Sequence, residues 1–360
     1  MPLLVGGFLE LPLGVLAGHG RRRRLAVLGG GIVFVLTLLG VASARSFTVL
    51  LCAFIAFYPA SGAFVSLTQA EIMDAWPDRQ AHVMARWDLA GSAGAVAGPL
   101  LLIAVLASGG GWRAGYLVLA GLAALVWLGA YLRGPAAPAA GSPGADSDSD
   151  GERAERRPWT ERAREIAAAL RDWGTLRWLL LLEVADLLVD VFTGFLALYL
   201  VDIAHLTPAV AALAIAIRLG AALAGDAALI VVLERAGDLA VLRASAAAAA
   251  LLYPAFLLVP GTVPKLVVLA ALSAVTAPWY PLLQARLYGS LPGRSSVAVT
   301  LSSAAGLAGG LGPLAVGLVA QAFGLSWALA GLVVVPVAVL LVLAGARSRS
   351  APGPGPDVPA

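Results

Sequence analysis

Long apolar segments recur along almost the whole chain, and each has the length of a membrane-spanning helix. Such a helix needs about 20 consecutive, mostly apolar residues to cross about 30 Å of hydrocarbon. The pattern predicts eleven spanning segments, at residues 2–18, 25–43, 47–72, 88–107, 114–132, 176–201, 208–233, 239–259, 265–287, 296–320 and 327–345. We therefore expect an all-α polytopic membrane protein.

The composition separates the chain from soluble proteins. Of its 360 residues, 60% are hydrophobic and only 12% are charged, whereas about a quarter of a typical soluble domain is charged. Its one cysteine, Cys52, leaves no internal disulfide. The H-E-x-x-H, G-x-S-x-G and P-loop patterns are absent, and the three histidines, His19, His82 and His205, build no metal site. We expect no enzyme activity, no cofactor and no nucleic-acid partner.

Two parts of the chain, about 215 residues apart, resemble each other. Three pairs of short segments match, namely 67–71 with 282–286, 77–79 with 292–294, and 98–99 with 312–313. Repeated blocks of apolar helices are typical of secondary transporters. The repeat therefore predicts two helical bundles related by pseudo-symmetry.

Basic residues are distributed unequally between the two sets of loops. Most of the 24 lie in the loops of one face, whereas only Arg45, Arg113 and Lys265 lie in loops of the other. Because cytoplasmic loops carry the excess of Arg and Lys, the arginine-rich face, with the C-terminus, is expected in the cytoplasm. Together with the preference for arginine over lysine, this predicts a bacterial inner-membrane protein.

A long polar connection divides the chain into an N-terminal bundle at 1–133 and a C-terminal six-helix bundle at 176–345. The connection, 134–175, begins rich in Pro, Gly, Ala and Asp and cannot bury enough apolar surface to fold. Its end, 159–171, is amphipathic and predicts a short helix on the membrane surface. The tail, 346–360, is expected to be disordered.

The repeat indicates that the first bundle has five helices and lacks its opening one. Shifted by 215 residues, the second helix of the C-terminal bundle, 208–233, overlaps the first helix of the chain, 2–18. Three explanations remain open: a start codon placed too late, a truncated gene, or a true eleven-helix variant.

The first basic loop carries a family motif. Gly14, Leu16 and the basic run from Arg21 fit G-x-L-x-D-R-x-G-R-R, which lies between helices two and three of the major facilitator superfamily, although Gly18 stands where that family has Asp. The chain resembles this family from residue 1 to 345. The resemblance implies a latch, in which the charged residues of this motif and of its copy in the second half hold an outward-facing state. The candidate latch residues are Gly14, Arg21, Arg22, Glu234, Arg235 and Gly237. The alternative for the arginines is a role in topology alone.

A glycine-rich helix motif follows in the fourth segment. Gly94, Gly98 and Pro99 resemble the G-x-x-x-G-P motif of drug/proton antiporters in the same family, and Gly312 and Pro313 match it in the second half. Small residues at this spacing let helices approach closely, and proline bends the helix. The residues are candidates for a hinge, or for ordinary tight packing.

Ionisable side chains inside predicted spans are costly, so they usually face a cavity or a partner. Glu183, Asp186 and Asp190 share one helical face, and Arg218 lies at a similar depth on the next helix. Asp186 and Asp190 are the first candidates for proton coupling, with Arg218 tuning them. Further acidic candidates for the proton site are Glu183, Asp226 and Glu10, which aligns beside Asp226. The alternative is a static buried salt bridge between Asp190 and Arg218.

Aromatic and amide side chains occupy related positions in both halves. The candidates for a substrate cavity are Tyr58, Gln69, Trp279, Tyr280 and Gln284. Such groups bind an amphipathic molecule by stacking and hydrogen bonding. Each of them could equally serve packing or the membrane interface.

Together these features favour a monomeric, proton-coupled exporter of a small molecule that works by alternating access in the lipid bilayer. An importer of the same family is the first alternative. The second is a truncated membrane protein that does not transport.

Overall fold

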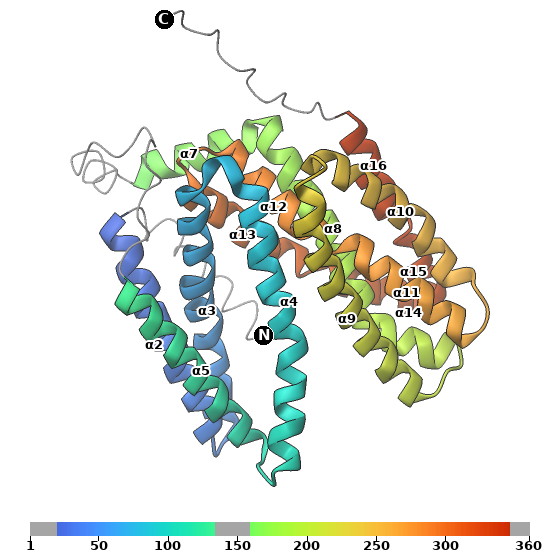
Figure 1. Ribbon diagram of the computed structural model, residues 1–360, viewed down its shortest axis with the longest axis horizontal. Helices are drawn as coiled ribbons and strands as arrows, with labels where there is room; N and C mark the ends of the chain where they lie inside the picture. The colour runs from blue at the N-terminus through green and yellow to red at the C-terminus, as the bar shows by residue number, and fades with distance from the viewer. Residues whose placement is uncertain (1–19, 134–158, 346–360) are drawn as a thin grey trace, which may run out of the picture.

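The computed structural model describes residues 20–133 and 159–345, and these residues form helices without a β-strand (Figure 1). Ten helical stretches in these ranges are long and apolar enough to span a membrane. The expected all-α polytopic fold is confirmed. The predicted span at 2–18, the start of the linker at 134–158 and the tail at 346–360 lie outside the described residues. The division into five and six helices therefore stays a prediction.

Most helices lie within two or three residues of the predicted segments at their starts, but α4 begins eight residues before the predicted start at residue 88. Four of them make up the first group: α2 (Gly20–Ser43), α3 (Phe47–Ala75), α4 (Gln80–Ala107) and α5 (Trp112–Arg133), with a short 3-10 turn, η1 (Pro77–Arg79), before α4. The second group follows helix α7 (Trp159–Arg171). It contains α8 (Trp173–Leu198), a π-helical turn η2 (Tyr199–Ile203), α9 (Pro208–Leu233), α10 (Asp238–Leu258), α11 (Thr262–Thr276), α12 (Trp279–Ser290), α13 (Ser295–Gly309), α14 (Gly312–Phe323), α15 (Leu325–Gly331) and α16 (Val334–Ala344).

Side-chain caps define several helix starts. Asp172 accepts hydrogen bonds from the backbone amides of Gly174 and Thr175 at the start of α8. Thr207 caps α9 in the same way, and Pro208 follows as its first residue. Both patterns satisfy amides that have no partner inside the helix. They explain why these spans begin where they do.

The first group packs through small residues. A Cβ atom on Gly30 of α2 would lie 2.6 Å from the Cβ of Ala63 in α3, so only glycine allows this approach. On another face of α2, the indole of Trp127 in α5 donates a hydrogen bond to the Leu28 carbonyl at 2.9 Å. Close approach and a satisfied indole together hold α2, α3 and α5 as one unit.

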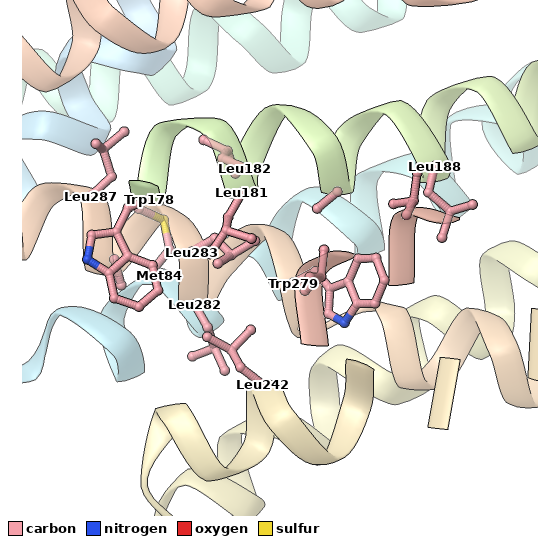
Figure 2. Packing of buried hydrophobic residues seen from close by; sticks show 14 of the residues in the cluster. Met84, Trp178, Leu181, Leu182, Leu188, Leu242, Trp279, Leu282, Leu283 and Leu287 are labelled. Carbon is pink, nitrogen blue, oxygen red and sulfur yellow. The ribbon is translucent and has the colours of Figure 1, made fainter. Parts of the chain in front are cut away.

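The second group contains most of the buried core. Figure 2 shows Leu181, Leu182 and Leu188 of α8 above Leu242 of α10 and Leu282 of α12. Tyr253 of α10 donates a hydrogen bond to the Leu329 carbonyl at 2.8 Å, which ties α10 to α15. Apolar packing and this hydrogen bond therefore hold the helices of the second group together around α8.

The two groups meet mainly at one end of the molecule. We call it the arginine-rich end: α3 ends there, α4 and α8 begin there, and Arg79, Arg235 and Arg294 lie at its surface. Helix α4 packs against α9 and α12, and α3 packs against α13. Figure 1 shows α4 and α9 close together near this end and farther apart toward the other. The structure is thus closed at the arginine-rich end.

Candidate functional site

A polar cavity of about 210 Å³ lies between the two groups. It is lined from α3, α8, α12 and α13 by Ser66, Gln69, Leu182, Glu183, Asp186, Tyr280, Gln284, Tyr288, Val299, Ser302, Ser303 and Gly306. Carboxylates, amides and hydroxyls converge here from both groups. The cavity therefore offers hydrogen-bond donors and acceptors to a small polar ligand.

The acidic face of α8 supplies the carboxylates of this cavity. Glu183 and Asp186 line it, while Asp190 is exposed one turn farther along the helix. Asp186 interacts electrostatically with both Glu183 and Asp190. At 1.5 Å of rise per residue, Asp186 lies about 20 Å from the start of α8, which places it inside the membrane. The predicted spacing thus brings the three acids together.

Arg218 of α9 lies beside this face. Its guanidinium donates a hydrogen bond to the Val189 carbonyl at 3.3 Å and interacts electrostatically with Asp190. Within the described part of the chain, no salt bridge joins Arg218 to Asp190 directly. Arg218 is therefore a neighbour that influences Asp190 without neutralising it in a close ion pair.

The two glutamines of the repeat both reach the cavity. Gln69 of α3 is buried, contacts the sulfur of Met84 at 3.0 Å and forms a hydrogen bond with Tyr280. Gln284 of α12 donates to the Ser302 hydroxyl at 3.5 Å. These side chains therefore line the cavity from different groups, one from α3 and the other from α12.

The other two aromatic candidates lie elsewhere. Trp279 is 1% exposed, and its indole nitrogen donates to the Ser245 hydroxyl of α10 at 3.0 Å. Figure 2 shows its ring packed in the core of the second group. Tyr58 makes an edge contact with Phe57 on α3 and does not line the cavity. Neither side chain therefore lines the cavity in this conformation.

A further acidic pair, which includes a residue absent from our sequence predictions, lies at the interface of α4 and α9. Asp88 and Asp226 are within hydrogen-bonding range of each other. Asp226 is 2% exposed, and the Ser92 hydroxyl of α4 donates to its Oδ2 at 2.5 Å. In the sequence, the sign that could have pointed to Asp88 is its position as the first residue of the predicted span at 88–107. The span in fact begins at Pro77, so Asp88 lies inside it.

The arginine-rich end is closed by a polar contact between the groups, formed by Arg23, Asp74 and Ser295. Arg23 of α2 forms a salt bridge with Asp74 of α3 at 2.8 Å and donates to the Ser295 hydroxyl of α13 at 2.9 Å. The Ser295 hydroxyl in turn donates to Asp74 at 2.5 Å. Both Arg23 and Ser295 are at least nine-tenths buried. This cross-group contact joins the first group to the second.

The predicted latch residues occupy different places. Gly14, like Glu10, lies outside the described residues, as does the side chain of Arg21, and Arg22 is exposed at the start of α2. In the second half, Glu234 and Arg235 are exposed in the turn after α9, and Gly237 precedes α10.

The charge pair that forms in the second half lies next to the predicted motif. Asp238 accepts from Arg286 of α12 at 2.5 Å and from the amide of Leu239 at 2.8 Å. Both charged residues belong to the second group. This pair therefore stabilises that group internally and does not join it to the first.

The predicted hinge glycines also differ from one another. Among the described residues, a Cβ on Gly94 or Gly98 would meet no atom within 4 Å, and the following Pro99 is exposed. Gly312 packs against Leu187 of α8, and Pro313 lies in the first turn of α14. Helix α13 thus ends and α14 begins where small residues contact α8.

No site for a metal ion made of three or more His, Cys, Asp or Glu residues occurs in the parts of the chain that the structure describes.

Comparison with known proteins agrees with this architecture. The sequence profile described as "Major Facilitator Superfamily" matches residues 1–288. No curated protein matches the sequence. The solved structure of the E. coli fucose:proton symporter is similar, with a TM-score of 0.75 and 15% identity over 95% of this chain and 88% of that one. The human organic anion transporter gives 0.69 and 20% identity over 95% and 82%. A proton:xylose symporter bound to 6-bromo-6-deoxy-D-glucose gives 0.68 and 13% identity over 94% and 83%.

Proposed function

The chain belongs to the major facilitator superfamily, and from this premise we propose that it transports a small molecule across the membrane by alternating access coupled to protons. One observation carries the proposal: Glu183 and Asp186 face the cavity between the two groups, inside the membrane, with Asp190 one turn away. Carboxylates at this depth are costly unless they bind a proton, a cation or water. A proton that binds there changes the charge of the cavity that holds the substrate.

The chemistry of the cavity supports a polar or amphipathic substrate. Gln69 and Gln284 present amides from the two groups, and Tyr280 adds an aromatic ring that is 36% exposed. A hydroxyl-bearing or cationic molecule would satisfy these groups and the carboxylates of α8. Because the walls belong to both groups, such a ligand would contact each of them and sense their relative position.

For the direction we propose export, with protons moving inward, because α4 carries the glycine-proline motif that resembles drug/proton antiporters. Import with protons is the second candidate. It is favoured by the polar lining of the cavity and by the names of two similar structures, both of them proton symporters for sugars. If the arginine-rich face is cytoplasmic, as the positive-inside rule predicts, the structure corresponds to an outward-facing state.

The test combines a compound screen in an efflux-deficient bacterial host with transport in inverted membrane vesicles at several pH values. We expect Asp190→Asn and Asp186→Asn to abolish the pH dependence of transport, because an amide cannot exchange a proton. Asp202→Asn is the matched control, since Asp202 is an exposed carboxylate in the turn η2 that follows α8. A normal pH dependence in Asp190→Asn would contradict the assignment of Asp190. If folded wild-type protein moved no compound, the truncated, non-transporting alternative would gain support.

A further inference from the structure

We propose that Asp88 and Asp226 form a separate proton-binding site, and that the single proton they share holds α4 against α9. The proposal goes beyond the carboxylates of α8 and rests on the proposed function only in one respect, the relative movement of the two groups. It concerns the closed arginine-rich end and requires no knowledge of the substrate.

One carboxylate oxygen of Asp226 is buried without a hydrogen-bond donor. Asp226 is 2% exposed, and Ser92 donates to its Oδ2, but the buried Oδ1 has no hydrogen-bond donor among the described residues. A buried carboxylate oxygen without a donor is strongly unfavourable. The polar group within hydrogen-bonding range of Asp226, besides Ser92, is Asp88. A carboxyl group can act as a donor only when it carries a proton.

Electrostatic repulsion between Asp88 and Asp226 also favours a shared proton. Two carboxylates in contact cannot both be ionised without strong repulsion, and such pairs share one proton in other proteins. The titratable groups that face Asp88 from neighbouring helices are Asp186 of α8 and Tyr280 of α12. Neither is a cation that could replace the proton. On its far side, α9 packs against α11 through Gly225 and the apolar residues Ala274 and Ala277.

The position of the pair links it to closure of the arginine-rich end. Asp88 lies eight residues from Gln80, where α4 begins, and Asp226 lies seven residues from Leu233, where α9 ends, which corresponds to depths of about 10–12 Å. They come from different groups, so their contact exists only while the groups are together at this end. When the groups separate, each carboxyl meets water and the proton can leave. Binding of the proton and closure of this end are therefore linked.

Infrared spectroscopy tests whether the proton is bound. Purified protein in lipid should show the band of a protonated carboxyl group that is lost in both Asp88→Asn and Asp226→Asn. Asp202→Asn should leave this band unchanged. If neither pair variant removed the band of a protonated carboxyl group, the proposal would be overturned.

Distance measurements between spin labels test whether the proton holds the groups together. Labels on Arg79→Cys and Ala240→Cys, both exposed at the arginine-rich end, report its opening in a Cys52→Ser background. For one linked proton, the ratio of closed to open molecules should fall by about tenfold per pH unit over the range in which the open state has released the proton and the closed pair still holds it. In Asp88→Asn the amide is a permanent donor to Asp226, so the ratio should stay constant over the same range.

The outcomes separate this proposal from the proposed function. A pH-dependent ratio in Asp88→Asn equal to that of the wild type would refute the shared proton, whatever the transport assay shows. In Asp226→Asn the amide donates to Asp88, so this variant should behave like Asp88→Asn. The second variant keeps the test valid if the first one does not fold. Asp202→Asn should keep the wild-type response of this end, because its exposed carboxylate belongs to neither site. Loss of the response in Asp202→Asn would show that the response does not come from the Asp88–Asp226 pair and would also overturn the proposal.

Discussion

Ser295→Ala should open the arginine-rich end, because Ser295 makes both hydrogen bonds that join the two groups in the cross-group contact. It accepts from Arg23 at 2.9 Å and donates to Asp74 at 2.5 Å. Each of these bonds involves a charged partner, and such bonds contribute about 1.5–3 kcal/mol. Taking the lower value for both, closure loses about 3 kcal/mol, and the ratio of closed to open molecules falls about 100-fold.

Ser295→Ala should remove these two hydrogen bonds and leave the neighbouring structure unchanged. Ser295 is 1% exposed, so water cannot replace its hydroxyl while the end is closed. The Arg23–Asp74 salt bridge lies within the first group and remains after the change. Ser295 is the first residue of α13 and does not cap it, so the helix itself should persist.

The assay is the distance between spin labels at positions 79 and 240, measured at a pH at which the wild type is closed. Ser295→Thr is the control, because it keeps a hydroxyl at the same place and should retain most of the closed population. A shift of less than about threefold in Ser295→Ala would show that the hydrogen bonds do not control closure, and that apolar contacts of α4 with α12 do.

Two further predictions concern stability. Gly225→Ala should lower the melting temperature, since its Cβ would lie 2.5 Å from the Ala274 carbonyl oxygen. Such overpacking costs about 1–3 kcal/mol of stability. The control Gly29→Ala should not lower the melting temperature, because its Cβ would meet no atom within 4 Å among the described residues. Asp172→Ala should cost about 1 kcal/mol as a lost helix cap. The hydrogen bond from the Thr175 hydroxyl lowers the pKa of Asp172 below its ordinary value of 3.8. The charge of Asp172 therefore stabilises the fold above that value and loses this effect as the pH falls through the lowered pKa, so melting curves of wild type and variant should converge in acid.

The membrane spans were largely readable from the sequence. The predicted segment 208–233 coincides with α9 (Pro208–Leu233), because the hydrocarbon thickness sets the length and the Thr207–Pro208 pair sets the start. The span containing α4 was predicted eleven residues too short, at 88 instead of Pro77. The reason is that residues 77–88 are polar where the helix contacts the second group at the closed end. A hydropathy pattern treats such an interface as a loop.

Some contacts of the candidate site could be predicted from the sequence and others could not. A run of four arginines, at 21–24, does not reveal which one faces a neighbouring helix, and the structure brings Arg23 to Asp74. The three acids of α8 were identified correctly as one face, because helical periodicity fixes their relation. The Asp88–Asp226 pair depends on the packing of α4 against α9, and no local pattern contains that packing.

The two charge pairs at the arginine-rich end occupy related places in the repeat but have opposite sign. Shifted by 215 residues, Arg23 corresponds to Asp238, and Arg286 corresponds to Glu71, one turn before Asp74. The first pair is tied through Ser295 to a helix of the other half, whereas the second stays within its own half. During a transport cycle the Arg23–Asp74 pair therefore gains and loses its contact with the other half, whereas the Asp238–Arg286 pair stays formed. A substitution in the first pair should change the populations of the conformations. A substitution in the second pair should change how much folded protein the cell contains.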